Sequence, residues 1–240
     1  DGVIGTGDVD GKTIEKIGDY YKISVTQVSI AANPRFLLIP SPTALATRNA
    51  SFTGNGTDGV LGWGVQVEEG SYATSYIPTS GSTVTRNQDI FTRDGIGSLI
   101  NSTEGVLFVE MAALANDGTY RIISLTDGGT TNRVSVIFNN TPSNTIRAMV
   151  VSGSTTFDER LTVSSIIDFH KIAIKWKVND FALWIDGVEI ATDISGSVPV
   201  GMDRIVFEVG GGSLDFYGKV KQLQVYDTSL SDTQLAALTT

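Results

Sequence analysis

The chain of 240 residues contains no cysteine and a single histidine, His170. Without cysteine the protein cannot form disulfide bonds, iron–sulfur centres, thiolate zinc sites or a thiol nucleophile. With one histidine it cannot build a metal site that needs several imidazole ligands. These two absences exclude several classes of redox protein, metalloprotein and cysteine-dependent enzyme.

Charged residues are also few, and the negative ones predominate. Lys and Arg number 17 and Asp and Glu number 26, which gives a formal net charge of −9. A general nucleic-acid binder needs a basic surface that displaces counterions, so we expect no nucleic-acid partner. No apolar run approaches the ~20 residues of a membrane-spanning helix, so we expect no membrane insertion.

What the sequence has in abundance is alternation of apolar and polar residues, the pattern of half-buried strands. Gly, Asn and Asp separate such runs at intervals of roughly 8–15 residues, which favours an all-β, antiparallel sandwich over alternating strands and helices. The runs are residues 20–27, 35–39, 60–67, 106–112, 120–125, 133–138, 145–151, 172–177, 181–185, 204–209 and 218–226.

Two short turn sequences, at residues 178–180 and 186–187, predict how three of these strands are connected. Asp186-Gly187 separates FALWI from VEIAT, and this dipeptide is typical of a two-residue hairpin turn. Residues 178–180 separate IAIKWK from FALWI, so these three segments are expected to form a meander. Two helical signals are present: residues 231–235, which Ser229 or Ser231 could cap, and the weaker stretch 11–17, which could be a turn of helix or a loop.

Domain boundaries follow from the distribution of small and polar residues. The segment 76–103 contains Pro78 and several Gly and Ser residues, and it predicts a linker. Residues 104–240 suffice for an independent sandwich, whereas residues 1–75 carry too few strands for a closed one. The first residues lack the basic segment and apolar core of a signal peptide, and no initiator Met is present. We therefore expect a processed product or part of a larger protein.

Residues suited to catalysis are scarce. His170 is the only candidate base for a Ser-His-Asp triad, and no GxSxG elbow occurs. Glu68 and Glu69 are adjacent in the sequence, and because neighbours on a strand point to opposite faces, they would not oppose one another across a sugar. The ExDxxE strand pattern of laminarinase-like hydrolases is absent. We therefore predict that the protein is not an enzyme.

Calcium is the plausible cation, because oxygen ligands abound. Asp8 and Asp10 in Asp-Val-Asp-Gly resemble the opening of an EF-hand loop, but the twelfth position would be Asp19 instead of Glu. We therefore predict an ordinary turn at Asp8 and Asp10 and no cofactor. A structural calcium ion bound by these two carboxylates is the weaker alternative.

Aromatic and polar residues on strands are the remaining candidates for a ligand site. In IAIKWK, Trp176 shares the apolar face, whereas in FALWI, Trp184 lies opposite Phe181 and Leu183. Trp176 is therefore predicted in the core, and Trp184 as an exposed ring on which a sugar could stack. Arg121, Arg133 and Arg147 favour solvated positions at the rim of a sheet over ligand contact. The candidate ligand residues are Trp184, Arg121, Asn132, Arg133 and Lys175.

One segment closely resembles a known family. Residues 62–86 contain WGVQVEEGSYATSYIPTSGSTVTR, which is similar to the end of a carbohydrate-binding-module-like jelly roll in fibre and spike proteins of tailed phages and prophages. Upstream, GDYYKISV and SFTGNGT resemble a strand and a turn of the same module. This resemblance implies that residues 1–75 are a partial jelly-roll sheet whose first strands are missing.

The remainder resembles a companion domain. EGVLFVE, NRV, NDFAL and SLSDTQL occur in the order typical of a laminin-G or concanavalin A-like sandwich that ends in a short helix. The resemblance implies a concanavalin A-like jelly roll in residues 104–240. It also implies a fibre, spike or capsid-decoration protein at the virion surface, often a trimer, with host glycans or envelope and other virion proteins as partners.

Three functions stay open at this point. The first is weak multivalent attachment to a glycan or host surface by a non-enzymatic phage virion protein. The second is a polysaccharide lyase or glycoside hydrolase on the same sandwich, and the missing carboxylate pattern speaks against it. The third is a purely structural decoration protein that binds no sugar.

Overall fold

The computed structural model describes residues 11–27, 53–57, 59–86, 89–139 and 142–240. The chain divides into two compact units, Asp1–Arg86 and Asn87–Thr240. Strand β3, Thr92–Arg93, falls within the segment predicted as a linker, yet it pairs with strand β12, Arg204–Val206, of the second unit. The expected strand 35–39 and the candidate ligands Asp8 and Asp10 lie outside the described residues.

In the first unit, β1 (Gly11–Ile17) and β2 (Tyr20–Thr26) form an antiparallel hairpin. The weak helical prediction for residues 11–17 is therefore wrong, because the backbone of GKTIEKI pairs along its whole length with β2. Gly18 in the connecting turn has a φ of 62°, a conformation that favours glycine. The predicted strand 60–67 is also wrong, since no strand is assigned there; alternation alone does not supply a pairing partner.

The second unit is an antiparallel β-sandwich, as the alternation predicts. One sheet has five strands in the order β11-β10-β9-β4-β13, and the other has six in the order β3-β12-β5-β6-β7-β8. The short helix η1, Gly97–Leu99, follows β3. The strands are β4 (Glu104–Ala113), β5 (Arg121–Thr126), β6 (Asn132–Asn139), β7 (Thr145–Ser152), β8 (Ser154–Thr162), β9 (His170–Lys177), β10 (Phe181–Ile185), β11 (Val188–Asp193), β12 (Arg204–Val206) and β13 (Gly218–Tyr226).

The meander predicted from the turns is confirmed, because β9, β10 and β11 are neighbours in the five-stranded sheet. Asp186 and Gly187 both have positive φ, 50° and 80°, as the two central residues of a type I′ turn require. The polar strand β8, STTFDERLT, was not predicted, because only Phe157 of its residues is buried.

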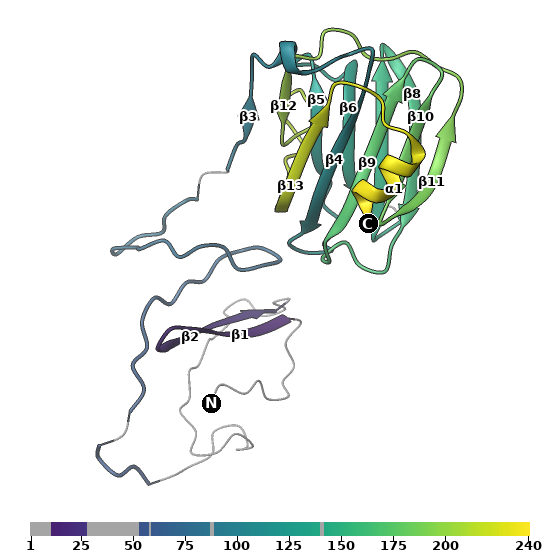
Figure 1. Ribbon diagram of the computed structural model, residues 1–240. Helices are drawn as coiled ribbons and strands as arrows, with labels where there is room; N and C mark the ends of the chain where they lie inside the picture. Colours follow the sequence, from purple (N-terminus) through teal and green to yellow (C-terminus); the bar gives the residue numbers. More distant parts are fainter. Residues whose placement is uncertain (1–10, 28–52, 58, 87–88, 140–141) are drawn as a thin grey trace. The chain divides into compact units, whose positions relative to one another are not determined.

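The main core lies between the two sheets, where inward-facing side chains of both pack together. Trp176 is fully buried there, which confirms its predicted position. A second cluster lies on the outer face of the five-stranded sheet, beneath helix α1 (Asp232–Thr239). Figure 1 shows α1 lying across this sheet, in contact with β9, β10 and β11. The helix predicted near residue 231 is thus confirmed, with Ser231 at its N-cap.

Candidate functional site

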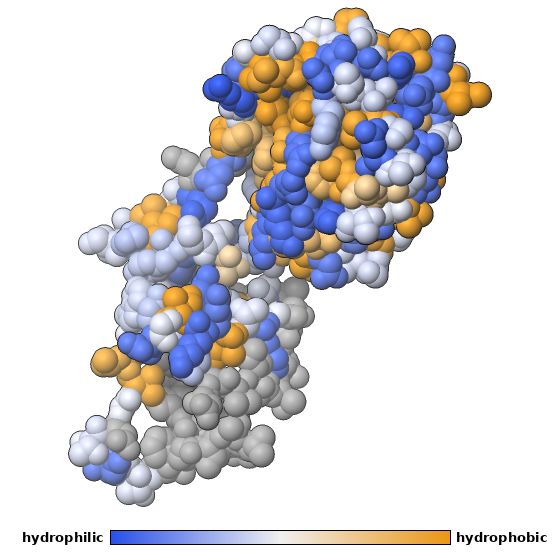
Figure 2. Space-filling model, in the orientation of Figure 1, coloured by the Kyte–Doolittle hydropathy of each residue, from blue (hydrophilic) through white to orange (hydrophobic). Residues whose placement is uncertain are grey.

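Trp184 lies on the predicted face of its strand, but that face is not open. Its side chain points away from the main core into the cluster beneath α1, where Leu235 of the helix packs, and only 7% of the residue is exposed. In Figure 2 hydrophobic residues show among hydrophilic ones between β13 and α1 on this side of the unit. The expectation of an exposed ring for sugar stacking is therefore wrong: helix α1, about 50 residues further along the chain, covers it.

Arg121, the first residue of β5, links that strand to neighbouring segments of the same chain. Its guanidinium donates to the carbonyl oxygens of Tyr217 at 2.7 Å and Thr119 at 3.0 Å, and to the Asp117 carboxylate at 2.8 Å. Only 1% of the residue is exposed, so the predicted solvated position at the rim is wrong. A buried guanidinium is stable only with partners of this kind, and here the protein itself supplies them.

Lys175 and Asn132 are also engaged within the protein. The Lys175 ammonium is 2.6 Å from the Asp180 carboxylate and 3.9 Å from that of Asp232, which belongs to α1. The Asn132 amide donates to Asp127 at 3.0 Å, and its carbonyl accepts the Val200 N–H at 3.1 Å. Lys175 lies on the five-stranded sheet and Asn132 on the six-stranded one, so the structure does not bring the predicted ligand residues together.

The outer face of the six-stranded sheet gathers several arginines instead. Val134, Val136, Ala148 and Val150 point into the core, so the residues between them on β6 and β7 point outward. Register places the outward residues of β7 and β8 opposite one another, Arg147 beside Arg160 and Met149 beside Asp158. We call this surface the arginine face; it consists of Arg133, Arg147, Met149, Asp158 and Arg160.

Arg147 and Asp158 form the best-defined ion pair of the arginine face. Both hydrogen bonds, from Nε and Nη2 of the guanidinium to the two carboxylate oxygens, measure 2.5 Å. These bonds raise the pKa of Arg147 and, with the charge of Arg147, hold the pKa of Asp158 below its ordinary value. Arg160 approaches the same carboxylate at 3.6 Å. The single acid of the face is therefore already shared between two bases.

Arg133 is the cation that this arrangement leaves without a carboxylate. Only 9% of the residue is exposed, and its buried Nε has no hydrogen-bond partner among the described residues. One Nη donates to the carbonyl oxygen of Thr130, and the other lies 3.7 Å from the Met149 sulfur. Burial, and then the like charge of Arg147, lower the pKa of Arg133. Within the described part of the chain, no Asp or Glu comes within 4.0 Å of its guanidinium.

The segment from Phe207 to Tyr217 packs over the β5 side of this sheet. Ser124 Oγ donates to the Glu208 carbonyl oxygen at 2.8 Å and is 2.8 Å from Ser135 Oγ. Gly210 approaches so closely that a Cβ there would lie 2.4 Å from the Gly129 carbonyl oxygen. Glu208 has a buried carboxylate oxygen, Oε2, that also lacks a hydrogen-bond partner. The accessible part of the face therefore lies over β7 and β8, where Arg147, Asp158 and Arg160 keep partly exposed side chains, whereas the described outward residues of β6 are buried.

The ion pair on the arginine face predicts a pH dependence of stability. The pKa of Asp158 is lower in the folded chain than in the unfolded one, so its contribution is present above the unfolded pKa of ~4 and is lost as the pH falls through the folded value. We expect Asp158→Asn to destabilise the second unit by about 1 kcal/mol at pH 7, since the pair is partly exposed. The difference should shrink toward pH 2 in urea titrations; a difference independent of pH would contradict the assignment.

Among the residues that the structure describes, possible catalytic groups do not assemble into a reactive set. His170 Nδ1 is 2.6 Å from Asp186, but Nε2 faces the backbone carbonyl of Ser165 at 2.9 Å, so neither nitrogen addresses a hydroxyl. Glu68 accepts both the N–H and the hydroxyl of Thr74, each at 2.6 Å. No cluster of three or more His, Asp or Glu suited to a metal ion occurs among the described residues.

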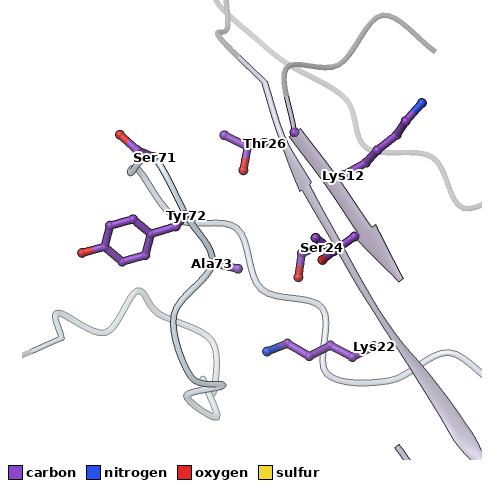
Figure 3. Close-up of a pocket in the computed structure, with 9 residues that line it drawn as sticks. Lys12, Lys22, Ser24, Thr26, Ser71, Tyr72 and Ala73 are labelled. Atoms are coloured by element: carbon purple, nitrogen blue, oxygen red, sulfur yellow. The ribbon is translucent and has the colours of Figure 1, made fainter. Parts of the chain in front are cut away.

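The first unit contains a shallow pocket, shown in Figure 3. The β1–β2 hairpin forms one side, with Lys12 and Lys22, and residues 71–73 form the other. Five of the nine lining residues are exposed, including both lysines, and exposed cations bind anions weakly in water. The pocket therefore offers less to a ligand than the arginine face does.

Part of the arginine face could have been predicted from the alternation of apolar and polar residues. In TIRAMVVS, alternation alone places Arg147 and Met149 on the face opposite Ile146 and Ala148. Asp158 gave no such signal, because its strand was not predicted and its ion pair depends on the β7–β8 register.

Comparisons with known proteins found similar folds among solved structures. No protein-family model and no curated protein matches the sequence, and no helix in the described ranges has the length and apolar character to span a bilayer. Domain 4 of AbnA, a GH43 extracellular arabinanase from Geobacillus stearothermophilus solved with arabinotriose, is 13% identical; the match covers 64% of this chain and 82% of that one, at a TM-score of 0.50. The CBM40 of the Ruminococcus gnavus IT-sialidase, solved with α2,3-sialyllactose, is 17% identical over 58% and 84%, at 0.48. At 13% identity the likeness to domain 4 of AbnA shows a shared β-sandwich fold and nothing beyond the fold.

Proposed function

We propose that the second unit is a non-catalytic glycan-binding domain and that it binds saccharide on the arginine face. The observation that carries this proposal is the composition of that face. It presents partly exposed Arg147, Asp158 and Arg160 around the apolar side chain of Met149. Saccharides offer hydroxyl groups to such charged hydrogen-bonding side chains and C–H surfaces to apolar ones. The outer face of the opposite sheet is less suited, because α1 covers its apolar centre.

The sequence resemblance supports a more specific role for the whole chain. WGVQVEEGSYATSYIPT and the sandwich motifs after it resemble phage fibre, spike and decoration proteins. We propose that the protein belongs to a virion surface and attaches it to host glycans, as an oligomer such as a trimer. Each site would bind weakly, and several sites on one particle would multiply the strength of attachment.

A glycan array probed with the full chain tests the binding proposal. We expect a restricted set of glycans to be retained, with dissociation constants in the range of about 0.1–1 mM for single sites and tighter apparent binding for a multimerised form. Arg147→Ala together with Asp158→Ala should abolish retention, because both groups reach the surface. As a matched control, Lys177→Ala with Glu104→Ala removes an ion pair of 3.1 Å from the five-stranded sheet.

The two double variants separate a local site from a general loss of charge, since each removes one cation and one anion. Retention that survives the first double variant would contradict the arginine face as the site. Absence of retention on every glycan would contradict the glycan-binding function itself. Incubation of retained glycans with the protein should leave them intact, and a shortened product would contradict the non-catalytic role.

A further inference from the structure

We propose that the glycan bound on the arginine face is acidic, and that Arg133 and Arg147 mark the position of its anionic group. This inference rests on the proposed function and names the chemical class of the ligand. The described outward-facing side chains of β6, β7 and β8 include three arginines and one aspartate. This local excess of positive charge occurs in a chain whose net charge is −9.

The key residue is Arg133, because its charge is buried and uncompensated. A cation removed from water is costly unless a counter-charge or a full set of acceptors replaces the water. Arg121, which is buried more deeply, has an acceptor for each of its three nitrogens, one of them a carboxylate. Arg133 instead has one carbonyl oxygen, one thioether sulfur and an unpartnered Nε. Two buried arginines in the same sandwich therefore differ in a way that folding alone does not require.

The position of Arg147 favours an anion over a neutral hydrogen-bond acceptor as the ligand group that lies near Arg133. Arg133 contacts Met149, and the carboxylate that Arg147 binds belongs to Asp158, the register partner of Met149. The two guanidinium groups thus approach the same point of β7 from opposite ends of the strand, and their like charges interact. An anionic oxygen placed there would lie close to both positive charges and offset their repulsion, although the Nε of Arg133 itself is buried beyond its reach.

Carboxylate and sulfate share this chemistry, and both occur on saccharides. A planar carboxylate fits the two-pronged geometry of a guanidinium, while a tetrahedral sulfate presents its oxygens in several directions. The carboxylate of Glu208, which also lacks a partner at Oε2, would repel either group if it lay close. It does not come within 4.0 Å of any arginine or lysine in the described residues.

The test uses the full chain and an array that carries each saccharide core in neutral, carboxylated and sulfated forms. We expect an acidic form of a core to bind about tenfold or more tightly than its neutral form, and the preference to weaken as salt is raised from 50 to about 500 mM. The carboxylated and sulfated arms show which anion is accepted. Equal binding of neutral and acidic forms would overturn this inference and leave the glycan-binding function standing. Absence of binding on every core would overturn both.

A variant pair identifies Arg133 as the group responsible. Arg133→Met should weaken binding of the acidic form by about tenfold to a hundredfold and leave the thermal midpoint of unfolding unchanged or higher, because it removes a buried unpaired charge. Lys177→Gln, at a residue whose side chain is 48% exposed on the five-stranded sheet, is the matched control and should weaken binding less than threefold. A lower midpoint with unchanged binding in Arg133→Met would show a purely structural role and overturn the assignment.

Discussion

Trp176→Ala should destabilise the second unit by about 3–5 kcal/mol, the largest effect we expect from a single truncation. The ring is completely buried between the sheets, and its Nε1 donates to the Asn101 carbonyl oxygen at 3.2 Å. It lies against Gly105 of β4, where a Cβ would be only 2.5 Å from the ring. The substitution therefore leaves a large cavity and an unpaired carbonyl, and the fixed sheet backbones can fill little of it.

Urea unfolding monitored by far-ultraviolet circular dichroism measures this loss, with Trp63→Ala as the matched control. Trp63 belongs to the first unit and is 70% exposed. Its ring packs edge-on against the rings of Tyr20 and Tyr76, with centroid separations of 6.0 and 5.9 Å. We expect this variant to leave the transition of the second unit unchanged, because the two residues belong to different compact units. A cost below about 1 kcal/mol for Trp176→Ala would show that the ring is not a core residue.

The strands of the sandwich could be predicted where a segment is apolar on one face and has turn residues at its ends. The segment 172–177 meets both conditions, and its alternation placed Trp176 in the core correctly. Strand β8 fails the first condition, because it is an edge strand held mainly by backbone pairing with β7. Residues 60–67 satisfy the alternation but pair with no segment that the structure describes, because a strand needs a second segment with which to pair.

The ligand site was harder to predict, because exposure depends on contacts between distant parts of the chain. Alternation gave the correct face for Trp184 and said nothing of the helix that covers it. Arg121 and Arg133 have the same residue type and similar positions at the start of strands, and both are buried. They differ in that Tyr217 and Asp117 accept hydrogen bonds from Arg121, whereas no carboxylate in the described ranges reaches Arg133. The alternation of apolar and polar residues cannot predict such partners, because they come from other segments of the chain.

The second large effect concerns the cover over Trp184. An eight-residue helix is too short to be stable alone, so α1 depends on its packing against the sheet. Leu235 is fully buried against the cluster that contains Phe108 and Trp184. Leu235→Ala should therefore cost about 2–5 kcal/mol and partly release α1. Thr233→Ala, at an exposed position of the same helix, should change stability by less than about 0.5 kcal/mol.

Release of α1 would make Trp184 the exposed ring that its place on the strand first suggested. In a Trp63→Phe background the two remaining tryptophans are both buried, so acrylamide quenching of their fluorescence reports mainly on this cover. We expect Leu235→Ala to increase quenching and shift the emission to longer wavelength under conditions where circular dichroism shows both sheets intact. Unchanged quenching in that variant would mean that the helix holds without Leu235. Since α1 lies on the sheet opposite the arginine face, glycan binding should survive as long as the sandwich stays folded, which separates the two sides of the domain experimentally.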